Sequence, residues 1–302
     1  MDRQKIVRKA LENGVLLTPG ALERINKSNI GTVLEEAKHS LVYGAPEAGK
    51  RGPEVVVKTA KQKARLKPKD IADFYSQKYK AIRQLLLKKT KAVSINKAQD
   101  LNSEVSVIGM VKDITPTGAT LEDQTGEIGV VGKLDVQEGD VLTVRGTVRE
   151  KKIMLSETAW PDVPLTRRPG RIHNTSLLLT AKDEKGADII FSTAGVEDDK
   201  VTHVSESPTW LTVRNNGTSL VVLAYKTEAK ELKDAADWLK KRQLPHKEVP
   251  GPKNLFIIEP VPDILWLIGP PAGKEIYKGI LIVSCGDGSA KINLETLEAE
   301  FK

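Results

Sequence analysis

Apolar residues recur at helical spacing at the start of the chain, and this pattern stops near residue 40. Thr18-Pro19-Gly20 is typical of a helix start, because Thr caps a helix and Pro fits its first position. Residues 1–40 are therefore predicted to form a small helical module. Residues 41–69 contain glycines, prolines and lysines without periodicity, which predicts a basic flexible linker.

A helical pattern followed by an alternating pattern occupies residues 70–165. Apolar residues share one broad face over residues 70–90, which predicts a long helix. From Glu104 onward, apolar and polar residues alternate in short segments that turns separate. The predicted strands are 104–114, 117–122, 127–132, 141–149 and 153–158. Five short strands with glycines near the corners predict an OB-fold β-barrel, with another small barrel or a sandwich fragment as the alternative.

The pattern changes again after Pro164, and residues 166–302 contain short apolar runs without alternation. One amphipathic helix is expected at about 228–242. Runs of this kind are typical of strands buried on both faces, so residues 166–302 are predicted to form an α/β domain. The runs are Leu177–Leu179, Ile189–Phe191, Leu211–Val213, Leu220–Ala224, Leu255–Ile258, Ile264–Ile268 and Ile280–Val283.

The net charge of +7 is concentrated in one segment of the chain. Residues 50–91 hold 14 Lys and Arg against three acidic residues, so this segment carries +11 and the remainder −4. A basic block suits contacts with phosphates, and a solvated tether is the alternative. The DNA-binding candidates in this block are Lys58, Lys61, Lys63 and Arg65.

The predicted barrel strands contain no Phe, Tyr or Trp, although barrels that bind single strands usually stack bases on such residues. Any affinity of the barrel for DNA is therefore expected to come from basic side chains. The candidates are Lys112, Lys133, Arg145, Arg149, Lys151 and Lys152.

Residues that commonly carry chemistry are few. Cys285 is the single cysteine, which excludes disulfides and cysteine-rich zinc sites, and the four histidines are not at metal-ligand spacing. Gly44–Lys50 is similar to a phosphate-binding P-loop, but Arg51 follows where Ser or Thr must bind magnesium. We therefore predict no catalytic residue, no metal site and no cofactor. Without a signal peptide or an apolar span, a cytoplasmic protein with no membrane partner is expected.

Several stretches resemble the small subunit of archaeal family-D DNA polymerase, a family related to the B subunits of eukaryotic replicative polymerases. The resemblance covers most of the chain, with a shortened middle. The stretches are Ala10–Pro19, Ile71–Lys89, Val105–Val111, Leu121–Gly126, Trp160–Pro164, Thr166–Pro169, Ile257–Leu265 and Tyr277–Ser284. The resemblance implies that residues 166–302 are a calcineurin-like phosphoesterase domain, which in active members is a 3′–5′ exonuclease.

The chain departs from this family where metal ligands are expected. Thr180-Ala-Lys-Asp183 stands in place of an Asp-x-His after the first strand, and Ser192-Thr-Ala-Gly195 in place of a Gly-Asp after the second. A segment with Gly-Asn-His is deleted, Tyr225-Lys226 replaces a lone histidine, and Gly269-Pro-Pro-Ala-Gly273 replaces a Gly-His-x-His. Two-metal hydrolysis needs such imidazoles and carboxylates. The domain is therefore expected to be a degenerate phosphoesterase with its exonuclease activity lost.

The first hypothesis is a non-catalytic accessory or scaffold subunit of an archaeal replicative DNA polymerase. It would bind DNA and the large catalytic subunit, and through that complex the sliding clamp or primase. The expected contact with the catalytic subunit is Ile264, Leu265, Trp266 and Tyr277, with simple core as the alternative. The other hypotheses are a free-standing OB-fold nucleic-acid-binding protein and an active metallophosphoesterase with rearranged ligands.

Overall fold

The computed structural model describes residues 16–17, 42–43, 53–59, 67–194, 201–205, 207–245 and 256–302. The chain divides into two units, Met1–Gly52 and Pro53–Lys302. In the first unit the described residues form a parallel pair, β1 (Leu16–Leu17) with β2 (Val42–Tyr43). The rest of the helical module predicted for residues 1–40 lies outside the described residues.

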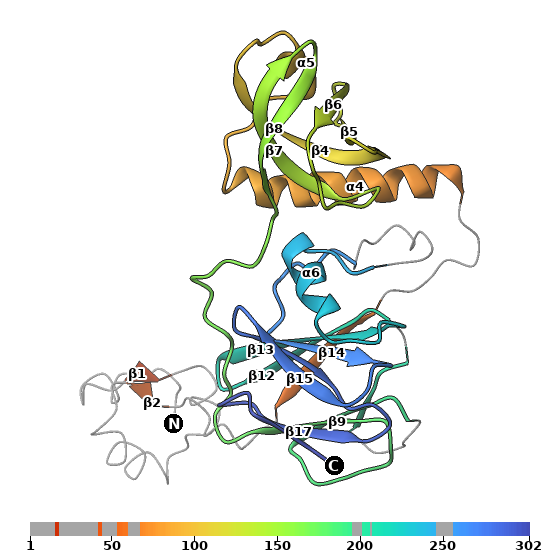
Figure 1. The fold of residues 1–302 in the computed structure, drawn as a ribbon. Helices are drawn as coiled ribbons and strands as arrows, with labels where there is room; N and C mark the ends of the chain where they lie inside the picture. Colours follow the sequence, from red (N-terminus) through yellow and green to blue (C-terminus); the bar gives the residue numbers. More distant parts are fainter. Residues whose placement is uncertain are drawn as a thin grey trace, which may run out of the picture. The chain divides into compact units, whose positions relative to one another are not determined.

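The second unit is mostly β-sheet, and it contains a closed barrel of five strands (Figure 1). The strands are β4 (Glu104–Thr115), β5 (Gly118–Glu122), β6 (Glu127–Val131), β7 (Val141–Arg149) and β8 (Lys152–Ala159). Their order is β4-β5-β6-β8-β7, with β6 and β8 parallel and the other neighbouring pairs antiparallel. Val107, Leu121, Leu142 and Ile153 are fully buried inside. The five strands predicted from the alternating pattern are therefore confirmed.

Two β-bulges interrupt the register of the barrel strands. The shifts lie between Val111 and Asp113 on β4 and between Arg145 and Gly146 on β7. A Cβ atom on Gly146 would lie 2.1 Å from the carbonyl oxygen of Met154. Glycine is therefore required at this close approach of β7 to β8, next to Ser156, the extra residue on β8.

Helix α4 (Pro68–Leu87) covers the outside of the barrel along β4 and β7 (Figure 1). Pro68 suits the first turn, and the Lys67 N–H donates to the Asp70 carboxylate at 3.0 Å. Ile82 and Leu86 are fully buried in a cluster with the barrel residues Ile108 and Val141. The short helix α5 (Ile95–Gln99) buries two of its side chains in the barrel core.

Two mixed sheets form the rest of the second unit. The six-stranded sheet has the order β15 (Gly273–Tyr277), β16 (Ile280–Ser284), β14 (Ile264–Ile268), β13 (Thr218–Lys226), β12 (Thr209–Asn215) and β3 (Glu54–Thr59). The five-stranded sheet has the order β11 (Val201–His203), β10 (Ile189–Ser192), β9 (Ser176–Thr180), β17 (Ser289–Asn293) and β18 (Ala299–Phe301). Strands β13, β14 and β16 are parallel to one another, and so are β9, β10 and β11.

The six-stranded sheet buries apolar side chains on both of its faces. One core lies between the sheets and joins Phe191 of β10 to Trp266 of β14. The other core lies on the opposite face, where Leu265 and Ile282 pack with Leu239 of α6 (Asp234–Lys241). Burial on both faces explains the continuous apolar runs in the sequence.

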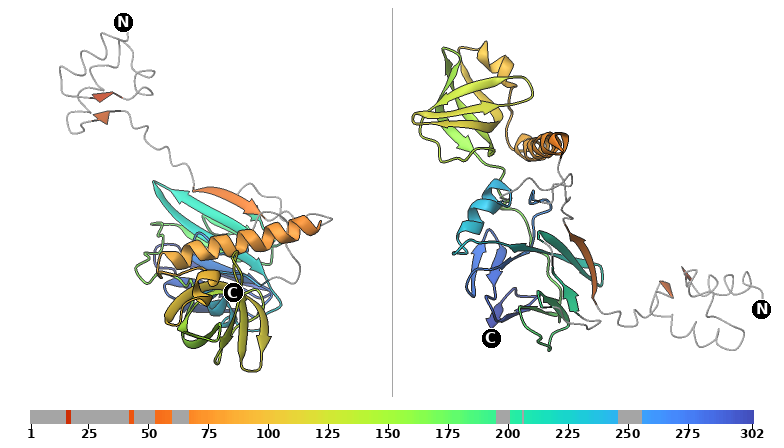
Figure 2. Two further views of the ribbon diagram at one scale, coloured as in Figure 1. Left: turned by 90° about the horizontal axis from the view of Figure 1, so that it is seen from above. Right: turned by 90° about the vertical axis from the view of Figure 1, so that its right-hand side faces the viewer.

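Residues 54–59 correct the prediction of a flexible linker over residues 41–69. They form β3, which pairs antiparallel with β12 along the edge of the six-stranded sheet (Figure 2). Val55, Val56 and Val57 are β-branched residues that favour a strand, and Val55 packs against the core between the sheets. The helix expected at 228–242 is also shorter, because regular helix is limited to α6.

Within the described residues, none of the helices combines the length and the apolar character that crossing a membrane requires.

Candidate nucleic-acid interface

The two mixed sheets pack face to face as a sandwich. The carboxyl ends of parallel strands from both sheets meet at one edge of this sandwich, and we call that edge the carboxyl edge. After β9, the Ala181 N–H donates to the carbonyl of Gly288 at 3.1 Å, in the loop that follows β16. After β10, the Thr193 N–H donates to the carbonyl of Thr180 at 3.0 Å. Ligand and metal sites of open α/β sheets usually lie at such an edge. The residues that end these strands therefore decide what the sandwich can do.

Serine and threonine hydroxyls end the strands at the carboxyl edge, and each stabilises its own turn. The side-chain oxygens of Thr180, Ser192, Thr227 and Ser284 each accept a hydrogen bond from the backbone N–H two residues later, at 2.9, 3.0, 3.1 and 3.2 Å. Thr180, Ser192 and Ser284 are fully buried and donate to the carbonyls of Lys182, Ala194 and Pro270. These hydroxyls are thus occupied by turn structure, as in the local motifs that Ser and Thr commonly form.

Groups that bind metals are dispersed over the described part of this domain and do not converge at the carboxyl edge. Over the described ranges, no three His, Cys, Asp or Glu side chains come close enough to hold an ion. His203 at the end of β11 contacts the carbonyl of Ala194 at 3.0 Å, and His173 pairs with Glu295 at 2.8 Å. Lys182 and Lys226 are exposed, and His39 and His246 lie outside the described residues.

Cys285 follows β16 and is almost fully buried. Burial raises the pKa of its thiol, which keeps the side chain protonated at neutral pH. The residue therefore fits a place in the core better than a role as a nucleophile.

Two of the basic residues predicted to bind DNA through the barrel are held in ion pairs. Lys112 lies 2.5 Å from Glu127, and Arg145 lies 2.9 Å from Glu104. The hydrogen bond and charge of Glu127 raise the pKa of Lys112, and those of Glu104 raise the pKa of Arg145. Both pairs are half exposed; Glu127 balances the charge of Lys112, whereas Arg145 keeps N–H donors that its contact with Glu104 does not use.

The other basic candidates of the barrel are exposed, and three of them surround one tight turn. Arg149 and Lys152 flank the two-residue connection between β7 and β8, and Lys151 is its second residue. Glu150 and Lys151 have φ of 49° and 58°, the left-handed conformation of a type I′ turn that usually takes Asn-Gly. The Lys152 side chain packs beside Gly129: a Cβ atom added to this glycine would lie 3.4 Å from the Lys152 Cγ. Lys133 is exposed in the loop after β6.

The candidates in the basic segment are divided between described and undescribed residues. Lys58 is exposed on the edge strand β3. Lys61, Lys63 and Arg65 lie outside the described residues.

The prediction of a partner contact at Ile264, Leu265 and Trp266 is wrong for this structure. All three side chains are fully buried in the two cores of the sandwich, because β14 is a central strand covered on both faces. Tyr277 is half-buried, and its hydroxyl donates to the Asp162 carboxylate at 2.9 Å. The alternative of simple core was therefore correct for β14.

Two large apolar side chains of the second unit, outside the barrel, remain strongly exposed. Leu165 is 82% exposed in the connection after Asp162, and Ile276 is 76% exposed on the edge strand β15, next to Tyr277. They are the most exposed large apolar side chains within the described residues. Neither residue belongs to one of the apolar runs in the sequence: Leu165 follows Pro164, and Ile276 lies between Glu275 and Tyr277.

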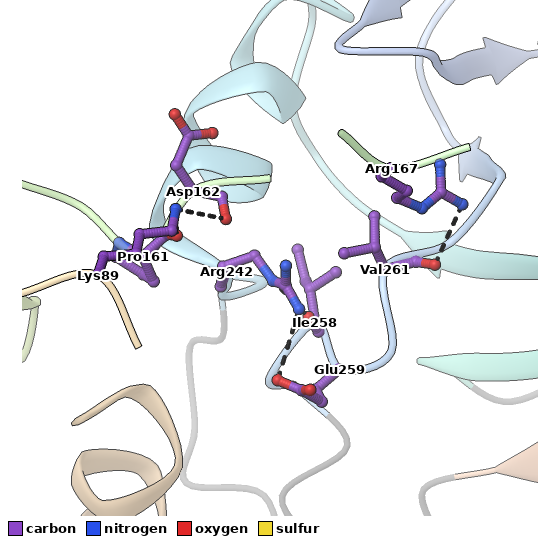
Figure 3. Close-up of polar contacts among 8 residues, drawn as sticks. All are labelled: Lys89, Pro161, Asp162, Arg167, Arg242, Ile258, Glu259 and Val261. Atoms are coloured by element: carbon purple, nitrogen blue, oxygen red, sulfur yellow. Dashed lines mark hydrogen bonds and ion pairs between the residues drawn. The ribbon is translucent and has the colours of Figure 1, made fainter. Parts of the chain in front are cut away.

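The connection between the barrel and the sandwich is fixed by charged side chains, several of which Figure 3 shows. Lys89 donates to the carbonyl of Pro161 and lies 3.4 Å from that of Asp162. The Asp162 carboxylate points away from Lys89 and binds Lys278 and Tyr277. Burial alone would raise the pKa of Asp162, but these hydrogen bonds lower it below its usual range. The connection therefore has defined contacts on both sides.

Buried charges hold the next part of the connection against the six-stranded sheet. The Asp263 carboxylate, almost fully buried, accepts hydrogen bonds from Arg167 and from the N–H groups of Gly170 (2.7 Å) and Val221 (2.8 Å). Nearby, the Arg242 guanidinium donates to the carbonyl of Ile258 at 2.7 Å (Figure 3). Burial lowers the pKa of Arg242. No sequence pattern indicates this cluster, since its members are widely separated along the chain.

A search of known protein families finds no model that matches the chain, and no curated protein matches it either.

Proposed function

We propose that this chain is a non-catalytic accessory subunit of an archaeal replicative DNA polymerase, similar to the small subunit of family-D polymerase. The observation that carries the proposal is the closure of the carboxyl edge by serine and threonine turns. Two-metal hydrolysis needs carboxylates and imidazoles that converge at this place. Thr180, Ser192 and Ser284 use their hydroxyls for turn structure instead. A sandwich of this kind is suited to binding.

The strand order of the barrel supports its assignment as an OB fold. OB folds are five-stranded Greek-key barrels that bind oligonucleotides on the face of their second and third strands and on neighbouring loops. Here those strands are β5 and β6, and the turn between β7 and β8 corresponds to the loop between the fourth and fifth strands. Its exposed Arg149, Lys151 and Lys152 favour contact with phosphates.

The two mixed sheets support the assignment of residues 166–302 as a degenerate calcineurin-like phosphoesterase domain. Parallel strands in both sheets end at one edge, which is the arrangement that the family resemblance implies. Strand β3 belongs to the same domain because it pairs with β12, so this domain starts before the barrel in the chain. The barrel is then an insertion between β3 and the later strands.

The proposed contact with the large catalytic subunit comprises two exposed apolar positions, Leu165 and Ile276. Both are large side chains that the described fold leaves uncovered. Large apolar side chains that pack into a partner are common anchors of stable interfaces. These two exposed positions replace Ile264, Leu265 and Trp266 of β14 as the proposed contact, because those three side chains are buried.

Capture by the catalytic subunit tests the proposal. The purified chain should bind the immobilised large subunit of the family-D polymerase from the same organism, and Leu165→Ser with Ile276→Ser should weaken binding about tenfold or more. Ile114→Ser, at a residue 50% exposed on the barrel, is the matched control and should bind normally. An absence of capture by the unaltered chain would contradict the accessory role.

A nuclease assay tests the non-catalytic part separately. The chain is incubated with a 5′-labelled single strand and Mn²⁺, and the length of the strand is followed on a gel. We expect no shortening from the 3′ end. Digestion that co-purifies with the chain and disappears in a Lys182→Ala, Asp183→Ala variant would show an active site at the carboxyl edge.

A free-standing OB-fold nucleic-acid-binding protein is the second candidate, and the exposed basic turn between β7 and β8 favours it. A chain of this kind would bind single-stranded DNA with the same affinity in the presence and absence of the catalytic subunit. The accessory subunit should instead bind DNA more tightly within the complex, because both subunits then contact the strand. A binding titration with and without the catalytic subunit separates the two.

A further inference from the structure

A hollow of about 330 Å³ lies on the outer wall of the barrel, away from the β5–β6 face. Residues of three strands and of the segment after α4 line it. In the register of the sheet, Arg145 of β7 stands opposite Ser106 of β4 and Glu157 of β8, and Thr143 stands opposite Ala159. The lining residues are Lys89, Thr90, Lys91, Ser106, Thr143, Arg145, Glu157, Thr158 and Ala159.

The side-chain hydroxyl of Thr143, which lines this hollow, forms no hydrogen bond within the described fold. Its residue is 2% exposed, and its hydroxyl has no hydrogen-bond partner among the described residues. Buried hydroxyls are normally hydrogen-bonded, so one without a partner beside a hollow indicates a place for a ligand. Thr90, Ser106 and Thr158 place further hydroxyl-bearing residues in the same lining.

The charge of the lining is positive. Lys89, Lys91 and Arg145 line the hollow with one carboxylate, Glu157, although Lys89 also donates to the Pro161 carbonyl and Arg145 pairs with Glu104 outside the lining. Glu104 binds one side of Arg145, but a guanidinium has five N–H donors and keeps others for a second acceptor. Lys91 is exposed, and no ion pair is described for it within residues 67–194. Cations beside hydroxyl donors are the combination that binds phosphate oxygens.

We propose that this hollow binds a phosphate group, and that in the DNA-binding role it holds a backbone phosphate of a single strand. The second part rests on the proposed function. Arg145 and the basic turn at Arg149 lie on the same strand, four residues and so about 13 Å apart. One DNA strand running along β7 would therefore contact both.

Two ligands distinguish the sources of the phosphate: inorganic phosphate, and a labelled oligodeoxythymidine of about 12 nucleotides, within the usual site size of an OB fold. Calorimetry measures the first and fluorescence anisotropy the second. Lys91→Gln and Thr143→Val remove one cation and one hydroxyl, and Thr143→Ser keeps the hydroxyl. Lys97→Gln removes an exposed cation from α5 and controls for net charge.

Lys91→Gln and Thr143→Val should each weaken the binding of both ligands about threefold to tenfold, as expected for one lost phosphate contact. Thr143→Ser and Lys97→Gln should bind as the unaltered chain does. Thermal melting should show Thr143→Val at least as stable, because a buried hydroxyl without a partner has been removed. Lower affinity without lower stability is an effect that a purely structural role does not produce.

Unchanged binding by Thr143→Val, or equal losses in Lys91→Gln and Lys97→Gln, would overturn the phosphate pocket. A third result is possible: inorganic phosphate binds and is weakened by Lys91→Gln and Thr143→Val, but the oligonucleotide does not bind. This result would confirm the pocket and contradict the DNA role. The proposed function and the pocket thus fail by different results.

Discussion

Lys78 is an ionisable residue that the fold places in an unfavourable position. It lies on α4 with 3% of its surface exposed. Burial lowers its pKa to about 8, Asp140 acts in the opposite direction, and Lys241 lowers the pKa further. The Lys78 amine lies 5.9 Å from the centre of the Tyr75 ring. The protonated form is therefore destabilised in the folded state.

Stability is expected to rise with pH through the titration of Lys78. The folded side chain loses its proton near pH 8, but the unfolded one keeps it up to about 10.5. The unfolded state then binds more protons, so the free energy of unfolding increases from about pH 8 upward. The penalty well below pH 8 is on the order of 3 kcal/mol, from a pKa lowered from 10.5 to about 8. Above about pH 10, ionisation of unfolded tyrosines opposes the trend, because burial raises the pKa of Tyr79 and Tyr225 to about 12.

Urea unfolding at pH 7, 8 and 9 measures this effect. Lys78→Met should be more stable than the unaltered chain at pH 7 and should lose the rise between pH 8 and 9. Lys80→Met, on the exposed side of the same helix, is the matched control and should keep the rise. If both variants keep it, Lys78 is not its source.

At the scale of elements, Asp263 joins the connecting segment to β13 and β14. Arg167, with 14% of its side chain exposed, donates to the Asp263 carboxylate, which is 6% exposed. Asp263→Ala should destabilise the chain by about 3–5 kcal/mol, because the buried guanidinium loses its counter-charge. A second change, Arg167→Met, should recover part of the loss by removing that charge.

Denaturant midpoints of the single and double variants test this role. Glu104→Ala is the control, since both side chains of its pair with Arg145 are half exposed, so its loss should cost at most about 1 kcal/mol. Equal effects of Asp263→Ala and Glu104→Ala would show that burial of the Asp263–Arg167 pair adds nothing to stability.

The elements that sequence predicts well are those with one exposed and one buried face. The barrel strands alternate, so their positions and the helix before them followed from the pattern. β3 was missed because glycines, prolines and lysines surround its short valine run. The partner contact was misplaced on β14, since a continuous apolar run is the same for a central strand and for a surface patch.

The candidate site was less predictable than the fold because it depends on pairs of distant residues. Glu104 and Arg145, and Lys112 and Glu127, come together only through the register of the barrel. The unpartnered hydroxyl of Thr143 likewise has no signal in the sequence, where Thr143 is one residue of a predicted strand. A list of basic residues therefore overstates the charge available to DNA.

For the molecule as a whole, the distribution of paired and exposed charges determines how DNA binding depends on salt. Each phosphate contact releases counterions, and for single strands the slope of log K against log salt changes by about 0.7 per contact.

Lys151→Gln with Lys152→Gln removes two exposed cations at the β7–β8 turn, so the slope should become shallower by about 1.4. Lys112→Gln should leave the slope unchanged, because Glu127 already balances that charge at 2.5 Å. Anisotropy titrations of a single strand at several salt concentrations measure the slopes. Equal slopes for both variants would mean that the turn lies outside the path of the DNA.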